Sequence, residues 1–294
     1  MIVGRESKSR KVFNVFNVTL FLLINVICLY PLWYILVQSL SDGAKAAHAI
    51  FWPMNFTLEN YRMILNRADI GHALLISVLR TVIGTSITVL ACMLLGYLFT
   101  KQDMPFRKLL YRMLTITMYV SGGLIPTYLV FKSYGINNTF WVYLLPTAID
   151  AYYVILIKTY VESLPASVEE SAMLDGAGVF TIFLKIIMPM SLPIIATIAI
   201  YASVGQWNSW FDNHLYCINN ESLETLQYLL YKYMREAQNI TNEMREKNPN
   251  MTIKITPRGV RMTITMITTV PILLVYPFLQ RYLIKGLLIG AVKG

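Results

Sequence analysis

The sequence predicts an all-α integral membrane protein with six transmembrane helices. Hydrophobic residues occupy 56% of the 294 positions and charged residues only 14%, whereas soluble domains usually carry about 25% charged residues. The mean hydropathy is +0.52. The apolar residues also gather in long runs, and a helix needs roughly 20 such residues to cross a bilayer. So much apolar surface is better buried in lipid than in one protein core.

Six largely uncharged runs are the candidate spans. In chain order they are 12–41, 71–100, 113–131, 139–157, 186–211 and 262–280. The first is longer than the apolar core of a signal peptide, which covers about 7–15 residues, so an uncleaved helix is expected there. The third contains Gly122, Gly123 and Pro126, which weaken or kink a membrane helix.

The basic residues orient this stack of helices with both termini in the cytoplasm. Residues 1–11 would form a cytoplasmic N-terminus, and 12–294 a single transmembrane domain. Cytoplasmic loops are enriched in Lys and Arg, and the segments placed inside carry Arg5, Lys8, Arg10, Lys11, Lys101, Arg107, Lys108, Arg112, Arg281, Lys285 and Lys293. The outer loop 212–261 is also basic, but long loops are translocated largely regardless of charge.

Motifs for catalysis, metal binding and nucleotide binding are absent from the sequence. The three cysteines and three histidines are scattered without metal-ligand spacing. Neither H-E-x-x-H nor G-x-S-x-G occurs, which argues against an intramembrane enzyme. No phosphate-binding G-x-x-x-x-G-K-[ST] loop is present, so any ATP hydrolysis must come from another polypeptide. The net charge of +9 lies mostly at the ends of the spans, and no nucleic-acid partner is expected.

The inner segment 162–189 carries the most specific pattern, which predicts two short helices around a glycine hinge. Ser167 and Glu170, three positions apart, fit a capping box. Gly176 and Gly178 permit the turn that ends the first helix. Neighbouring carboxylates give this hairpin an acidic surface, which suits either a solvated surface or a docking element.

This segment resembles the coupling motif of binding-protein-dependent ABC import permeases, E-A-A, three residues, G, nine residues, I-x-L-P. Here it reads Glu170-Ser171-Ala172, then Gly176, then IIMP at 186–189. The two departures, Ser171 and Met188, are small changes in volume. The stretches SGGLIPTYLV at 121–130, VGQWNSWFD at 204–212 and PILLVYPFLQRYLIKGLLIGAVKG at 271–294 are similar to the carbohydrate-uptake branch, close to its oligosaccharide and lipoprotein-system permeases.

The resemblance implies a type I ABC importer permease fold in the bacterial plasma membrane. Such a permease forms half of the path for a sugar or oligosaccharide delivered by an extracytoplasmic binding protein. The implied partners are a second homologous permease, two cytoplasmic ATPase subunits that bind ATP and Mg, the sugar-binding protein and membrane lipid. No cofactor is expected in this chain. An ion-coupled secondary transporter is the alternative, but such folds commonly show structural repeats and midplane carboxylates, and only one Asp lies in the six runs.

The resemblance also assigns the residues that would contact the ATPase. By position in the motif they are Glu169, Glu170, Ser171, Ala172, Leu174, Asp175, Gly176, Ala177 and Gly178.

Charged and aromatic residues in and beside the spans are candidates for the substrate path. Arg80 and Asp150 lie inside spans, where a charge costs roughly 2.5–3.5 kcal/mol on insertion scales. We expect them to approach each other or to line one polar cavity, with a purely structural ion pair as the alternative. The full candidate set is Arg80, Tyr119, Asp150, Tyr201, Gln206, Trp207, Asn208 and Trp210. Interfacial Trp residues that only anchor the helix are the alternative for the last group.

The outer loop 212–261 contains a helical pattern over 221–240. Its apolar positions are Leu223, Leu226, Leu230, Tyr233, Met234 and Ala237. An amphipathic helix is therefore expected, followed by a polar stretch at 241–258. The resemblance implies that this loop meets the binding protein, and a flexible spacer is the alternative.

Overall fold

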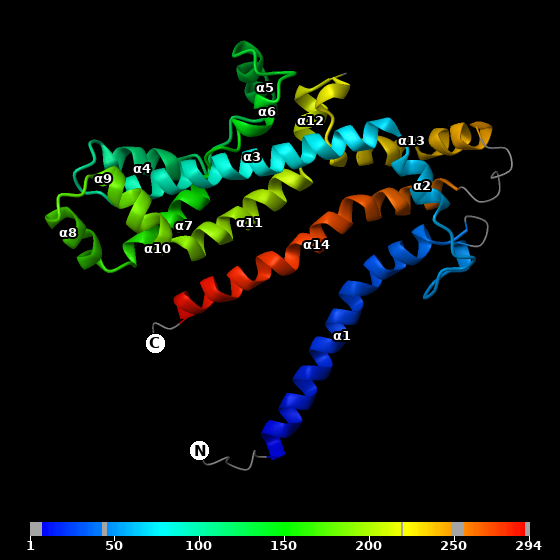
Figure 1. The fold of residues 1–294 in the computed structure, drawn as a ribbon, viewed down its shortest axis with the longest axis horizontal. Coiled ribbons are helices and arrows are strands. Elements are labelled where there is room, and N and C mark those ends of the chain that lie inside the picture. The colour runs from blue at the N-terminus through cyan, green and yellow to red at the C-terminus, as the bar shows by residue number, and fades with distance from the viewer. Residues whose placement is uncertain (1–7, 43–45, 219, 248–255, 292–294) are drawn as a thin grey trace. The chain divides into compact units, whose positions relative to one another are not determined.

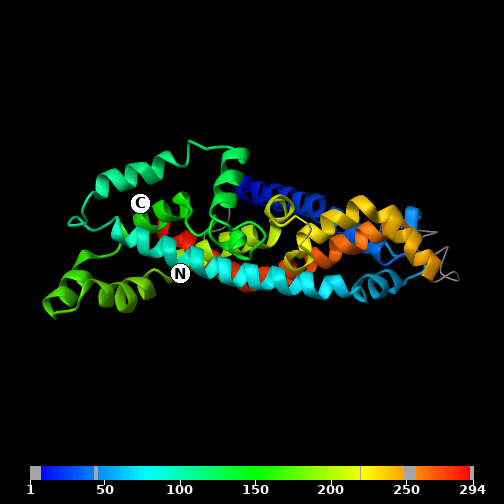
Figure 2. The same cartoon turned by 90° about the horizontal axis from the view of Figure 1, so that it is seen from above.

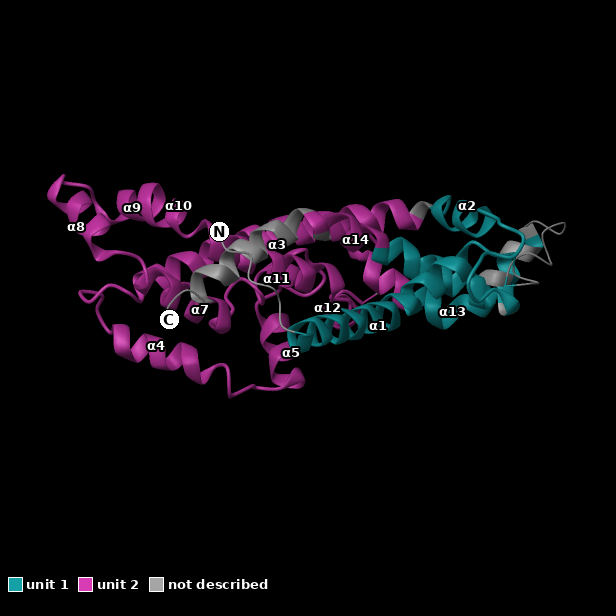
Figure 3. Ribbon diagram, turned by 90° about the horizontal axis from the view of Figure 1, so that it is seen from below, with its two compact units in different colours: residues 1–67, 232–269 teal, residues 68–231, 270–294 magenta. Residues whose placement is uncertain are grey.

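The computed structural model describes residues 8–42, 46–218, 220–247 and 256–291, and every regular element in these ranges is a helix (Figure 1). The chain divides into two compact units (Figure 3). Unit 1 comprises 1–67 and 232–269, and unit 2 comprises 68–231 and 270–294. The expected N-terminal segment 1–11 and the polar stretch 241–258 lie partly outside the described residues.

Unit 1 is built on the end of the long helix α1 (Lys8–Ser39). Most of α1 is exposed, as expected for a helix that faces lipid, and only its last three residues are buried. Gln38 Nε2 donates to the carbonyls of Ala46 and Ala49 at 2.6 and 2.7 Å, which closes the short η1 turn (Ala46–His48) onto the helix end. The unit also contains α2 (Glu59–Leu65).

Unit 2 is organised along α3 (Ala68–Leu98), against which α11 (Leu192–Asn208), α7 (Ala151–Glu162) and α6 (Trp141–Leu144) pack (Figures 1 and 2). Small residues permit the close approach. A Cβ on Gly96 would lie 2.5 Å from the Ile157 side chain, and one on Gly84 would lie 2.6 Å from Gln206 Nε2. This is how helices pack in membranes, where dispersion contacts replace the hydrophobic effect.

The core of unit 2 lies between the Leu98 end of α3, α7 and the helices that follow α7. Its buried members are Cys92, Met93, Tyr97, Phe99, Val154, Ile157, Val161, Ala172, Ile182, Phe183, Ile187 and Ile198. A smaller cluster contains Ile76, Val142, Tyr143, Leu144 and Cys217. The two clusters occupy different stretches of α3.

The third and fourth expected spans are not continuous helices, and the fifth is interrupted at Ser191. The third is broken into α4 (Arg107–Ile116) and α5 (Leu124–Ser133), and Gly123 precedes α5 with φ +84°. The fourth is broken between α6 and α7 around Pro146. Freed carbonyls there accept from α3 side chains, since Thr88 Oγ1 donates to Thr147 O at 2.8 Å. Irregular backbone inside a membrane protein needs such internal partners.

In the described residues, fewer than six helices are long and apolar enough to cross a bilayer. Three helices are long and apolar enough to cross a bilayer, namely α1, α3 and the start of α14 (Pro257–Ala291). A fourth span results if the bent pair 179–190 and 192–208, which meet at 79°, is one crossing.

The amphipathic helix expected in the outer loop is present as α13 (Leu226–Lys247), preceded by the short η3 (Glu221–Leu223). Its buried residues are Leu226, Leu229, Tyr233 and Ala237. The expected face was partly wrong, because Leu229 is buried while Met234 is 43% exposed. Periodicity alone does not separate neighbouring positions at the edge of an apolar stripe.

Candidate functional site

The expected hairpin is present, and a glycine turn ends its first helix. Helix α8 (Ala166–Leu174) is followed by α9 (Val179–Ile182), the π-helical η2 (Phe183–Ile187) and α10 (Met188–Met190). Gly176 has φ +80°. Its N–H donates to Met173 O and the next N–H donates to Ala172 O, both at 3.0 Å. These two bonds form a Schellman motif, in which glycine avoids the strain of a left-handed residue.

The expected capping box at the start of the hairpin is wrong. Helix α8 begins at Ala166, with the extended Pro165 before it and no side-chain cap. Ser167 therefore lies inside the first turn rather than ahead of it, and its carbonyl accepts from Ser171 Oγ at 2.8 Å. A capping residue must precede the helix with non-helical dihedral angles.

The hairpin is seated on the Leu98 end of α3. Ala172 is 8% exposed and belongs to the same buried cluster as Tyr97 and Phe183, whose rings lie 5.3 Å apart. The sequence analysis grouped Ala172 with the partner-facing residues. In the structure its small side chain instead lets α8 approach the chain's own core.

An ion pair holds the inward face of α8 against the end of α3. Glu169 pairs with Lys101 and accepts from the Tyr97 hydroxyl at 3.1 Å. The ammonium group of Lys101 also lies 4.3 Å from the centre of the Tyr97 ring, and burial lowers the pKa of Lys101. The Glu169 carboxylate is therefore engaged within the chain, and its contact with a partner stays a prediction.

The outward face of the hairpin is an exposed apolar tip with an acidic margin. Leu174 is 89% exposed and Phe180 is 67% exposed. We call Met173, Leu174, Val179 and Phe180 the hairpin tip. Glu170 and Asp175 are exposed beside it. Exposed apolar side chains on a polar inner segment make the hairpin tip a candidate contact surface.

Sequence reasoning found Leu174 but missed Met173, Val179 and Phe180. The available signal was the presence of large apolar side chains on both sides of a Gly-Ala-Gly turn. A turn that only connects two helices in water is normally polar.

A second polar site surrounds Arg80, whose side chain is 1% exposed. Its Nε donates to Gln206 Oε1 at 2.8 Å, and its Nη1 donates to Ser209 O at 3.3 Å and to Asp212 Oδ1 at 3.1 Å. A further ion pair joins Arg80 to Asp212. The guanidinium lies 4.6 Å from the centre of the Tyr143 ring. We call these five residues the Arg80 cluster; it joins α3 to α6, to the end of α11 and to α12 (Phe211–Tyr216).

The expected approach of Arg80 to Asp150 is wrong. Asp150 caps α7, where its Oδ1 accepts from the N–H groups of Tyr152 and Tyr153 at 2.8 and 3.2 Å. The Asp150 backbone contacts Cys92, twelve positions beyond Arg80 and so roughly 18 Å further along α3. Sequence spacing did not reveal that a charge near a span centre was a helix cap.

The other path candidates lie in separate places. Gln206 belongs to the Arg80 cluster and also donates to Thr147 Oγ1 at 2.7 Å. Trp210 stacks on Tyr231 with ring centres 4.3 Å apart, and Asn208 Oδ1 accepts from Gln227 at 3.3 Å. Tyr119 and Tyr201 are exposed by 83% and 51%.

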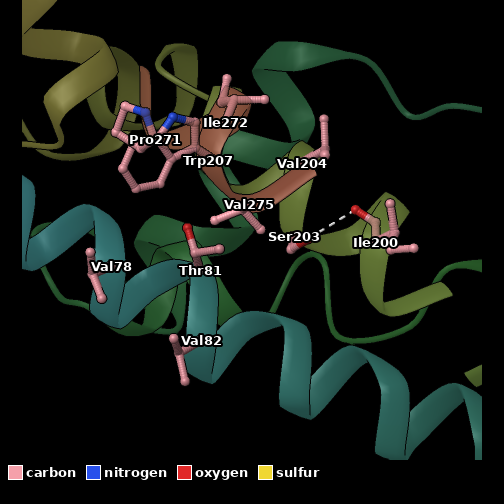
Figure 4. Close-up of a pocket in the computed structure, with 10 residues that line it drawn as sticks. All are labelled: Val78, Thr81, Val82, Ile200, Ser203, Val204, Trp207, Pro271, Ile272 and Val275. Atoms are coloured by element: carbon pink, nitrogen blue, oxygen red, sulfur yellow. Dashed lines mark hydrogen bonds between the residues drawn. The ribbon is translucent and has the colours of Figure 1, made fainter. Parts of the chain in front are cut away.

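Trp207 lines a cavity of about 280 Å³ in unit 2 (Figure 4). The remaining lining residues are Val78, Thr81, Val82, Ile200, Ser203, Val204, Pro271, Ile272 and Val275. The hydroxyls of Thr81 and Ser203 donate to carbonyls of their own helices at 2.7 and 2.9 Å. The wall is therefore apolar, which suits a packing partner or lipid better than a sugar rich in hydroxyl groups.

In the part of the chain that the structure describes, no three His, Cys, Asp or Glu side chains gather to hold a metal ion. Cys92 and Cys217 are buried and Cys28 is exposed, all as free thiols.

The bilayer-length apolar helices define a membrane protein. The chain belongs to the family of binding-protein-dependent transport system inner membrane components, whose family model matches residues 89–289. The match contains both the hairpin and α11.

Relatives match nearly the whole chain. The polygalacturonan/rhamnogalacturonan transport system permease protein YtcP of Bacillus subtilis is 36% identical over 280 residues, which are 93% of this chain and 95% of that protein. Protein LplC of the same organism is 35% identical over 292 residues, or 98% and 97% of the two chains. A bacterial ABC transporter involved in the import of the acidic polysaccharide alginate has a similar fold, with a TM-score of 0.86 at 24% identity over 95% of this chain and 99% of that chain.

These similarities confirm the expected family, the type I importer permease fold and the location in the bacterial membrane. The chain is a multi-pass transport permease, and its family is not a family of enzymes.

Proposed function

We propose that the chain forms half of the translocation path of an ATP-driven importer for a sugar or oligosaccharide. The names of its relatives support a carbohydrate cargo, since YtcP is named for polygalacturonan and rhamnogalacturonan, and a 29% identical permease of Rhizobium meliloti is named for alpha-glucosides. An extracytoplasmic binding protein delivers the cargo, and a second homologous permease completes the path. Family membership disfavours the ion-coupled alternative.

The hairpin tip is the observation that supports a separate ATPase subunit as the source of energy. Fully burying a Leu or Phe side chain contributes roughly 1.5–3 kcal/mol, so a partner groove that covers Leu174 and Phe180 gains substantial free energy. Glu170 and Asp175 at the margin of the tip suit a groove with basic residues. We assign this groove to a cytoplasmic ATPase subunit, which binds ATP and Mg. Two copies of this subunit are expected, one on each permease.

The proposed topology has six crossings with both termini in the cytoplasm, in one transmembrane domain over 12–294. Two crossings are broken ones, formed by α4 with α5 and by α6 with α7. The segment 162–189 then lies inside, and 212–261 lies outside, where α13 meets the binding protein.

Sugar contact is proposed for the exposed members of the path candidates, Tyr119, Tyr201 and Asn208, and for Trp210, two positions after Asn208. Aromatic faces and amides suit the C–H faces and hydroxyls of a sugar. Arg80 and Gln206 support the path by holding its helices together, because their polar groups already bond within the chain.

Site-specific photo-crosslinking tests this proposal. A crosslinker in place of Leu174 should capture a nucleotide-hydrolysing subunit in the assembled complex, whereas one in place of Tyr134, which is 77% exposed after α5, should not. The same preparation is tested for uptake of oligogalacturonides in proteoliposomes. An active complex with no ATPase captured at Leu174 would refute the coupling role. Uptake that stops when the proton gradient collapses while ATP remains would favour the secondary transporter.

A further inference from the structure

The Lys101–Glu169 ion pair and the Tyr97–Glu169 hydrogen bond link the hairpin to the end of α3, which Lys101 follows by three residues. Both side chains are 20% exposed, so water screens this pair less than it screens a surface pair. Tyr97 contacts both partners, through its hydroxyl to Glu169 and through its ring face to Lys101. A residue at the end of α3 thereby contacts both charges.

The packing on this side of α8 is incomplete. A cavity of about 190 Å³ lies between the start of α8 and the ends of α3 and α7, with Lys101, Glu162 and Glu169 among its lining residues. The buried cluster around Ala172 supports the other side of α8. The ion pair is therefore the direct connection beside the cavity.

Helix α3 continues from this connection to the Arg80 cluster. Tyr97 and Arg80 are 17 positions apart, or roughly 26 Å along an α-helix. The helix is uninterrupted between them, and an uninterrupted helix carries a displacement from one end to the other. The hairpin and the α11–α12 junction thus both contact the same continuous helix, α3.

We propose that the Lys101–Glu169 pair, held by Tyr97, is the joint that makes α3 follow the hairpin. This inference rests on the proposed function and deepens it. Glu169 is a positioning residue: it acts through α3, whereas its neighbour Glu170 faces outward.

The chain offers a matched control in the Lys158–Glu162 pair. These residues are four positions apart on α7, at 2.7 Å, and have exposed fractions of 19% and 46%. Their ion pair stays within one helix, although Lys158 also lies 5.1 Å from the centre of the Tyr111 ring of α4. The control therefore removes only the Glu162 charge, which should leave coupling unchanged.

The first experiment measures oligogalacturonide uptake per ATP hydrolysed by the complete complex in proteoliposomes. Glu169→Gln and Lys101→Met should each lower this ratio about fivefold, a size typical of coupled neighbouring residues, while the subunits still co-purify. The exchange Lys101→Glu with Glu169→Lys should recover part of the loss, and Glu162→Gln should match the wild type. An unchanged ratio in both single variants would overturn the inference.

The second experiment needs no ATPase. Spin labels at positions 174 and 106, with the native cysteines replaced by Ser, report the distance between the hairpin and the segment after α3 in the purified chain. Glu169→Gln should broaden the distance distribution, and Glu162→Gln should not. An unchanged distribution refutes the joint even in a working importer, whereas failure to capture an ATPase at Leu174 refutes the proposed function alone.

Discussion

The Arg80 cluster and the hairpin both place charged and aromatic groups along α3, yet they use them in opposite ways. Arg80 is almost completely buried, and its donors bond to Gln206, Ser209 and Asp212 within the chain. In the hairpin, only Glu169 is engaged in this manner. Glu170, Asp175 and the apolar tip are exposed.

The difference shows how burial separates structural charges from docking charges. A charge removed from water is tolerated only where it is paired and hydrogen-bonded, so the partners of Arg80 had to be present in the same chain. An exposed carboxylate or leucine carries no such requirement and is free to meet another subunit.

The largest effect is expected from breaking the Arg80–Asp212 pair. Asp212→Ala leaves a buried guanidinium without its carboxylate, which should destabilise the protein by about 3–5 kcal/mol. Thermal unfolding of the purified permease in detergent measures this change. The double variant Arg80→Met with Asp212→Leu should recover much of the loss. Strict additivity of the two single changes would contradict a direct pair.

A smaller effect of a different kind is expected at the hairpin tip. Leu174→Ala should leave thermal unfolding within about 0.5 kcal/mol of the wild type, since the side chain is exposed. It should weaken binding of the ATPase identified by crosslinking by roughly tenfold or more, in line with about 1.5–3 kcal/mol for burying a leucine. Titration of the purified ATPase against the reconstituted permease gives the affinity. If stability falls and affinity does not, the contrast between the two regions is wrong.

The smallest effect is expected at Asp150, the one acidic residue inside the six expected runs. Asp150→Ala removes a helix cap and should cost about 1 kcal/mol, whereas Asp150→Asn keeps a good capping side chain and should be nearly neutral. The same unfolding measurement applies. A loss at Asp150→Asn as large as at Asp212→Ala would show that Asp150 carries a buried charge pair after all.

Local features of the structure were predictable from local patterns. The hairpin and its Gly176 turn follow from a glycine that tolerates positive φ, and α13 follows from apolar spacing in 221–240. Glu169 and Glu170 could not be told apart, because adjacent residues on a helix differ only in the direction they face. That direction is decided by Lys101 and Tyr97, which are about 70 positions away.

The expected spans also combine features that a local pattern predicts with features that it does not predict. Hydropathy located the apolar runs, but it did not show that the third and fourth are broken. At the break around Pro146, Thr88 and Cys92 of α3 supply partners to the carbonyls of Thr147 and Ala148. Such compensation is invisible in a hydropathy pattern.

By itself, the sequence determined the membrane class, the hairpin and the family, because composition, periodicity and motif spacing are properties of the chain in one dimension. Only the tertiary structure decided which acid pairs with Arg80, which face of α8 is buried and where a span is interrupted. Those outcomes depend on how helices far apart in the chain are aligned, since Arg80 meets Asp212 across 132 positions. A charge that is buried away from water requires a partner, so each buried charge must be paired. Which partner it meets is decided by the packing that aligns the helices.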